Sequence, residues 1–96
     1  MAHFLVRLAH ARPDIMTPSL VNDHVSWLSD LTSKGIIILC GPCDDATAIL
    51  VLQCTTLEEA EKIAASDPFA KECAYAERSI VGFRLATPEN SFLLKT

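Results

Sequence analysis

The chain of 96 residues is half apolar and carries a formal net charge of -4. This length supports one ordinary hydrophobic core, so we expect a single domain over residues 1–96, with a C-terminal tail over 87–96. No Lys/Arg cluster is present, which argues against a nucleic-acid partner, because phosphate binding needs concentrated positive charge. No apolar run reaches the roughly 18 residues that span a bilayer, and no signal-peptide pattern opens the chain. We therefore expect a cytoplasmic protein with no membrane partner.

The first predicted elements are a strand and a helix. Apolar side chains alternate over residues 3–10, which predicts a strand with Phe4, Val6 and Leu8 on one face. A loop with Pro13 follows, and Pro18 then begins a helix that Thr17 caps. Gly35 ends this helix, because glycine adopts the left-handed conformation freely. Helical spacing places five side chains on one face: Leu20, His24, Trp27, Leu28 and Leu31.

Two short strands joined by a tight turn are predicted next. Residues 36–40 are β-branched and apolar on both faces, which indicates a strand buried on both sides that Gly41-Pro42 terminates. Residues 48–53 repeat this character. The two segments together predict a β-hairpin.

A second helix and a last strand complete the predicted elements. Thr56 and Glu59 stand at the spacing of a capping box, in which Glu59 reaches back to the cap. Asp67 caps a further short turn that begins at Pro68, and residues 74–83 form the last strand. The inward face of the second helix is predicted to hold Leu57, Ala60, Ile63 and Ala64.

The order of elements predicts an α+β fold of the ferredoxin-like, split βαβ type. In this βαββαβ arrangement a four-stranded antiparallel sheet carries both helices on one face. The second and third strands would then expose Ile, Leu and Val on the open face. Because a patch of this size is unusual on a monomer, we expect a homodimer that packs sheet against sheet. In the alternative interpretation the C-terminal tail folds over the open face.

The tetrad Cys40-Gly41-Pro42-Cys43 matches the thioredoxin active-site motif. Thioredoxin chemistry needs the tetrad to open a long helix whose N-terminal amides stabilise the thiolate. Only residues 44–47 separate it from a β-branched run here, so redox function through Cys40 and Cys43 is the least favoured alternative. We interpret Cys40 as a small core residue and expect reduced thiols. No second ligand pair stands at metal-binding spacing, and we predict no metal and no cofactor.

His24 is the main candidate for chemistry, because histidine exchanges protons near neutral pH. Its apolar neighbours are also typical of a packed core histidine, and Asp67 is equally explained as a helix cap. Arg7 lies in the first strand, where a solvated strand end is the simpler interpretation. The residues by themselves leave both the functional and the structural role open.

Five features in order resemble the YciI-like (YCII-related) domain family over almost the whole chain. They are a short first strand, His24 in the first helix, Gly35 before an apolar strand ending in Gly41-Pro42, the helix opening Leu57-Glu58-Glu59-Ala60, and Asp67-Pro68-Phe69. The resemblance implies a ferredoxin-like fold that dimerises through its sheets as a dimeric α/β barrel, similar in fold to muconolactone isomerases. It also implies a His-Asp active-site dyad, which matches His24 and Asp67. A dehydrochlorinase acting on a chlorinated hydroxyquinol belongs to this group.

The resemblance leads to a mechanistic hypothesis. His24 is a general acid or base, and Asp67 accepts its other imidazole N–H. The expected reaction is a proton transfer leading to isomerisation or elimination on a small cyclic or aromatic substrate. Arg7 and Trp27 are the predicted substrate-binding residues, the first holding an oxyanion and the second stacking on a ring. The alternative is a non-catalytic dimeric module that binds a ligand or a protein, with His24 packed and Asp67 acting as a cap alone.

Overall fold

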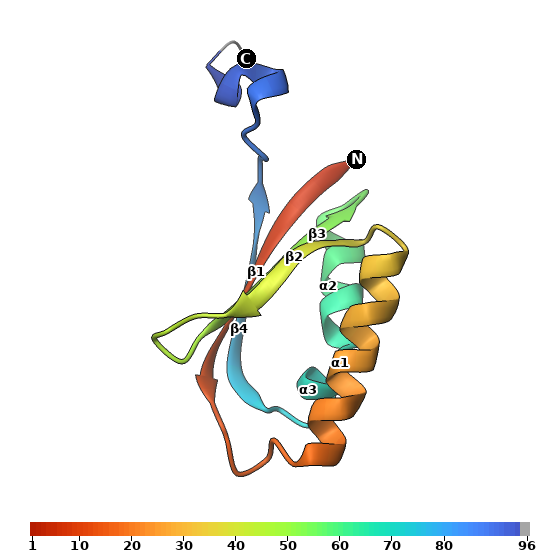
Figure 1. The fold of residues 1–96 in the computed structure, drawn as a ribbon, viewed down its shortest axis with the longest axis vertical. Coiled ribbons are helices and arrows are strands. Elements are labelled where there is room, and N and C mark those ends of the chain that lie inside the picture. The colour runs from red at the N-terminus through yellow and green to blue at the C-terminus, as the bar shows by residue number, and fades with distance from the viewer. Residues whose placement is uncertain (95–96) are drawn as a thin grey trace.

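The computed structural model describes residues 1–94. Its elements in chain order are β1 (Ala2–Ala11), α1 (Pro18–Ser33), β2 (Ile37–Pro42), β3 (Ala48–Cys54), α2 (Leu57–Ala65), α3 (Pro68–Lys71), β4 (Tyr75–Phe83) and a 3-10 helix, η1 (Pro88–Leu93). The strands form one antiparallel sheet in the order β2-β3-β1-β4. The α-helices lie on one face of this sheet (Figure 1). The predicted α+β, ferredoxin-like fold is confirmed.

Local capping fixes where the helices begin. The Thr17 hydroxyl accepts the Leu20 N–H at 3.2 Å, and the Thr56 hydroxyl accepts the Glu59 N–H at 3.1 Å. The Glu59 carboxylate accepts the N–H of Thr55 at 3.1 Å, one residue earlier than a standard capping box would place that bond. The two threonine bonds satisfy backbone donors that the first turn of each helix leaves free.

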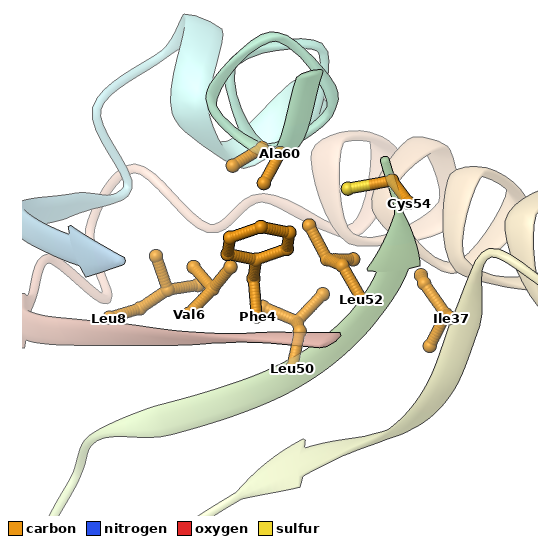
Figure 2. Packing of buried hydrophobic residues seen from close by; sticks show 9 residues of the cluster. Phe4, Val6, Leu8, Ile37, Leu50, Leu52, Cys54 and Ala60 are labelled. Atoms are coloured by element: carbon orange, nitrogen blue, oxygen red, sulfur yellow. The ribbon is translucent and has the colours of Figure 1, made fainter. Parts of the chain in front are cut away.

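The core lies between the sheet and the helices (Figure 2). Apolar side chains of β1 and β3 meet the small side chains of α2, which allow the helix to approach closely. The buried cluster includes Phe4, Val6, Leu8, Leu50, Leu52, Ala60 and Ala64. The expectation that Leu57 faces inward is wrong, since this first residue of α2 is 45% exposed at the helix end.

β2 differs from its prediction because it is an edge strand. It continues through Gly41-Pro42, whose proline needs no ladder donor at an edge, and Pro42 pairs with Ala48 of β3. Ile37 is buried, whereas Ile38, Leu39 and Cys40 are exposed. The expectations of a strand buried on both sides and of a core Cys40 are therefore wrong for this chain. Burial on both faces would have required a position inside the sheet.

The C-terminal tail leaves the body of the molecule. Figure 1 shows η1 beyond the end of the sheet, so within residues 1–94 the tail does not cover the open face. Its apolar side chains Phe92 and Leu94 are 59% and 86% exposed. Residues 95–96 of the expected tail lie outside the described residues. None of the helices within 1–94 is long and apolar enough to cross a membrane.

Candidate functional site

The fold brings His24 of α1 against Asp67, which lies between α2 and α3. His24 Nδ1 is 2.7 Å from Asp67 Oδ1, although the two residues are 43 positions apart in the chain. The exposed fraction is 16% for the His24 side chain and 4% for that of Asp67. A hydrogen bond this short in a largely dry position is strong, because little water competes for either atom.

Asp67 has two partners through the same oxygen. Its Oδ1 also accepts the backbone N–H of Phe69 at 2.9 Å, the capping bond that begins α3. The predicted cap is thus present together with the His24 contact, so one role does not exclude the other. Both bonds need an acceptor at Oδ1, which assigns the proton between the side chains to His24 Nδ1.

Two aromatic rings neighbour the imidazole of His24. Phe69 stacks on His24 with ring centroids 3.9 Å apart and an interplanar angle of 5°. Trp27 follows one helical turn later in α1, and its ring centroid lies 6.1 Å from that of His24 at an interplanar angle of 23°. Its indole N–H donates to the Ser66 hydroxyl at 3.0 Å, and that hydroxyl donates to the Ile63 carbonyl at 2.6 Å. These contacts fix the plane of the His24 ring.

An open cavity of about 260 Å³ lies against His24, between α1 and the sheet. Twelve residues line it, and most of them are apolar. They include Val21, His24 and Leu28 of α1, Cys40 and Pro42 of β2, and Tyr75 of β4. The second imidazole nitrogen, Nε2, has no hydrogen-bond partner within residues 1–94. The site therefore presents one exchangeable position beside an apolar space.

The predicted substrate-binding residues lie outside the lining of this cavity. Arg7 alternates with Val6 and Leu8, which point into the core, so Arg7 stands on the opposite face of the sheet. There it borders a surface hollow together with Asp45 and Glu77. Trp27 supports His24 and packs against the core. The structure therefore brings His24 and Asp67 together and leaves Arg7 apart.

The cysteine tetrad spans the end of β2 and the hairpin turn. Cys40 lines the cavity from the edge strand, and the N–H of Cys43 donates to the Thr47 carbonyl at 2.7 Å within the turn. No helix follows the tetrad before β3, so the thiolate-stabilising setting of thioredoxin is missing in this part of the chain. All four cysteines are free. Burial, followed by the negative charge of Glu59, raises the pKa of the Cys54 thiol.

Phe69 and Tyr75 line the cavity but were not among the predicted site residues. Phe69 is the second residue after the Asp67 cap, so its stacking position follows once Asp67 meets His24. Tyr75 begins β4, and its ring packs at a tilt on that of Phe69, with the ring centroids 6.2 Å apart. Burial, then the nearby Asp67 and Cys43, raises the pKa of Tyr75 above its ordinary value. The available signal was its place as the single tyrosine of the chain, at the start of the predicted last strand.

Comparisons with known proteins agree with this architecture. The family model described as the YCII-related domain matches residues 3–84. A search of curated proteins finds no match. Among solved structures, the chain is similar to the 5-chloro-2-hydroxyhydroquinone dehydrochlorinase of Burkholderia phenoliruptrix in complex with 2,5-dihydroxybenzoquinone. The TM-score is 0.69 at 19% identity, and the match covers 85% of this chain and 93% of the other. At this identity the likeness shows a shared fold.

Proposed function

Because this chain belongs to the family of YCII-related domains, we propose that it is a small-molecule enzyme with a His24–Asp67 acid-base dyad. The proposed reaction is a proton transfer that isomerises a small cyclic or aromatic substrate or eliminates a group from it. The observation that carries the proposal is the 2.7 Å contact of His24 and Asp67 at the wall of an apolar cavity.

The geometry supports separate roles for the two imidazole nitrogens. Asp67 accepts the Nδ1 proton, which leaves Nε2 of a neutral ring with its lone pair. Nε2 takes a proton from the substrate, and Asp67 stabilises the imidazolium that forms. The ring then returns this proton to another atom of the substrate, which completes an isomerisation. In an elimination the electron pair released by proton removal instead expels a leaving group from the adjacent carbon.

The size of the cavity supports a substrate with one ring. Apolar cavities of about 150 Å³ already accept benzene, and this cavity measures about 260 Å³. The additional space accommodates small substituents. The dehydrochlorinase of similar fold, whose complex holds a dihydroxybenzoquinone, supplies a first compound to assay.

We further propose a homodimer formed through the open sheet face. Val81 is 56% exposed in β4, and Leu39 is 47% exposed in β2. Val81 pairs with Leu5 across the sheet, which extends the apolar surface over neighbouring strands. A lysine at position 81 should place a charge in this interface, so V81K is expected to sediment as a monomer. V25K is the matched control, since Val25 is 53% exposed on the helical side. A monomeric wild type, or a V81K dimer, would refute the interface.

The proposal includes a cytoplasmic location. The four cysteines are free thiols in the structure, and thiols persist in reducing compartments. Fractionation of the source cells tests this point, and recovery from an extracellular fraction would oppose it.

The catalytic proposal is tested with H24Q and a matched variant, H10Q. The assay follows chloride release from 5-chloro-2-hydroxyhydroquinone and the ultraviolet spectra of other hydroxylated rings and lactones. H24Q is expected to lose roughly 10²- to 10⁴-fold in rate, the usual contribution of a general acid-base group. H10Q should keep the wild-type rate, because its exposed side chain lies apart from the cavity. Full activity in H24Q would refute the dyad. An inactive wild type whose H24Q variant is merely destabilised would support a non-catalytic binding module.

A further inference from the structure

The cavity beside His24 offers little polarity and, among the described residues, no Lys or Arg to pair with an anion. His24, Cys40 and Tyr75 are the lining residues whose side chains carry a nitrogen, oxygen or sulfur atom. Of the residues in 1–94, no Lys, Arg, Asp or Glu belongs to the lining. The Asp67 carboxylate is 2.7 Å from the imidazole. A carboxylate or phosphate entering the cavity would lose its water, find no fixed cation and be repelled by Asp67.

Tyr75 supplies a hydrogen-bond donor away from the dyad. Its ring packs on Phe69, and Phe69 stacks on His24, so the imidazole and the phenol flank the same phenylalanine. No hydrogen bond within residues 1–94 uses the Tyr75 hydroxyl. Burial and the charge of Asp67 raise its pKa, so the group keeps its proton across the neutral range. The phenol is thus a permanent donor beside an apolar space.

We infer that Tyr75 is a positioning residue whose hydroxyl donates a hydrogen bond to a ring oxygen of the substrate. The cavity thereby selects an uncharged hydroxy- or oxo-substituted ring over its carboxylated analogue. This inference rests on the proposed function and names its substrate class. Tyr75 holds the oxygen while His24 Nε2 exchanges the proton, so the two groups divide recognition and chemistry between them.

Equilibrium binding of three one-ring probes tests the inference without requiring turnover. Hydroquinone is the uncharged hydroxylated ring, gentisate is its carboxylated analogue, and toluene has no oxygen. The variants are Y75F, which removes one hydroxyl and keeps the ring, and the matched control S79A. Ser79 also lies on β4, but it pairs with Arg7 on the open face of the sheet. Calorimetry measures the affinity of each protein for each probe.

Wild type is expected to bind hydroquinone at least about tenfold more tightly than gentisate, since gentisate brings an unpaired charge. Y75F should lower the affinity for hydroquinone roughly three- to tenfold, the usual effect of losing one neutral hydrogen bond. Toluene should bind Y75F and wild type alike, which separates a lost hydrogen bond from a collapsed cavity. S79A should leave all three affinities unchanged.

Three results would overturn the inference: equal hydroquinone affinity in wild type and Y75F, gentisate binding as tight as hydroquinone, or no hydroquinone binding at all. Failure of the acid-base proposal is recognised separately, by an H24Q variant that turns over as fast as wild type. Selective hydroquinone binding that depends on Tyr75, together with such an active H24Q, would keep the recognition role and reject the dyad.

Discussion

Within residues 1–94, two histidine–carboxylate pairs of nearly equal length lie in very different surroundings. His24 Nδ1 meets Asp67 at 2.7 Å, and His10 Nε2 meets Glu77 at 3.0 Å on the sheet. The first pair is largely buried, with 16% and 4% of its side chains exposed, whereas the second is 71% and 61% exposed. Distance alone therefore does not distinguish a candidate site from a surface contact.

The surroundings decide what each pair can do. Asp67 is also held by the Phe69 N–H, and Phe69 fixes the His24 ring by stacking. These contacts hold both side chains of the buried pair in place, and His24 lines the cavity. The His10 pair is open to water, where side-chain entropy and screening leave an ion pair little net strength. A histidine that is held before the substrate arrives can exchange a proton without a costly rearrangement.

The largest expected difference between the pairs is in folding stability. D67A removes a helix cap and leaves the His24 and Phe69 donors without their acceptor, which should lower the free energy of unfolding by about 2–4 kcal/mol. E77A should change it by less than about 0.5 kcal/mol, as is usual for an exposed pair. Urea denaturation of the two variants measures both values. Equal losses of unfolding free energy in D67A and E77A would show that the buried pair stabilises the fold no more than the exposed pair.

A smaller expected difference is the effect of each pair's carboxylate on the pKa of Tyr75. Burial and Asp67 raise the pKa of this tyrosine, and Glu77 is not among the causes. Ultraviolet absorbance of the phenolate is specific here, since the chain has one tyrosine. D67N should lower the titration midpoint toward the ordinary value near 10, whereas E77Q should leave it in place. An unchanged titration midpoint in D67N would show that the Asp67 charge does not raise the pKa of Tyr75.

The raised pKa of Tyr75 also determines how the stability of the fold changes at alkaline pH. The unfolded tyrosine loses its proton near pH 10, while the folded one retains it to higher pH. Its stabilising contribution is therefore complete below about pH 10 and is lost as pH rises through the raised folded pKa. Y75F should unfold with a weaker pH dependence in this range, and an unchanged dependence would contradict the assignment.

Local sequence signals predicted the fold because each acts within a few residues. The caps Thr17, Thr56 and Asp67 all accept the backbone bonds that their positions indicated. The edge position of β2 depends on strand order, which hydrophobic periodicity does not encode, and so Cys40 was misplaced. The strand alternation around Arg7 already placed this residue on the face opposite the core, so its assignment to the site overlooked an available signal.

The site itself was predictable only in part. His24 and Asp67 were each singled out from the sequence, but their pairing came from the family resemblance, since no local rule joins positions that are 43 residues apart. The cavity and the ring stack depend on how α1 packs on α3 and the sheet, which a single sequence does not reveal. Phe69 and Tyr75 therefore emerged from the structure.

Nitrogen NMR of the neutral imidazole rings tests the central claim most directly. The contacts predict opposite tautomers, with the proton on Nδ1 in His24 and on Nε2 in His10. In the wild type, neutral His24 should carry its proton on Nδ1 and have a bare Nε2, and D67A should lose this preference. A neutral His24 protonated on Nε2 would leave no base at the cavity and would contradict the proposed function.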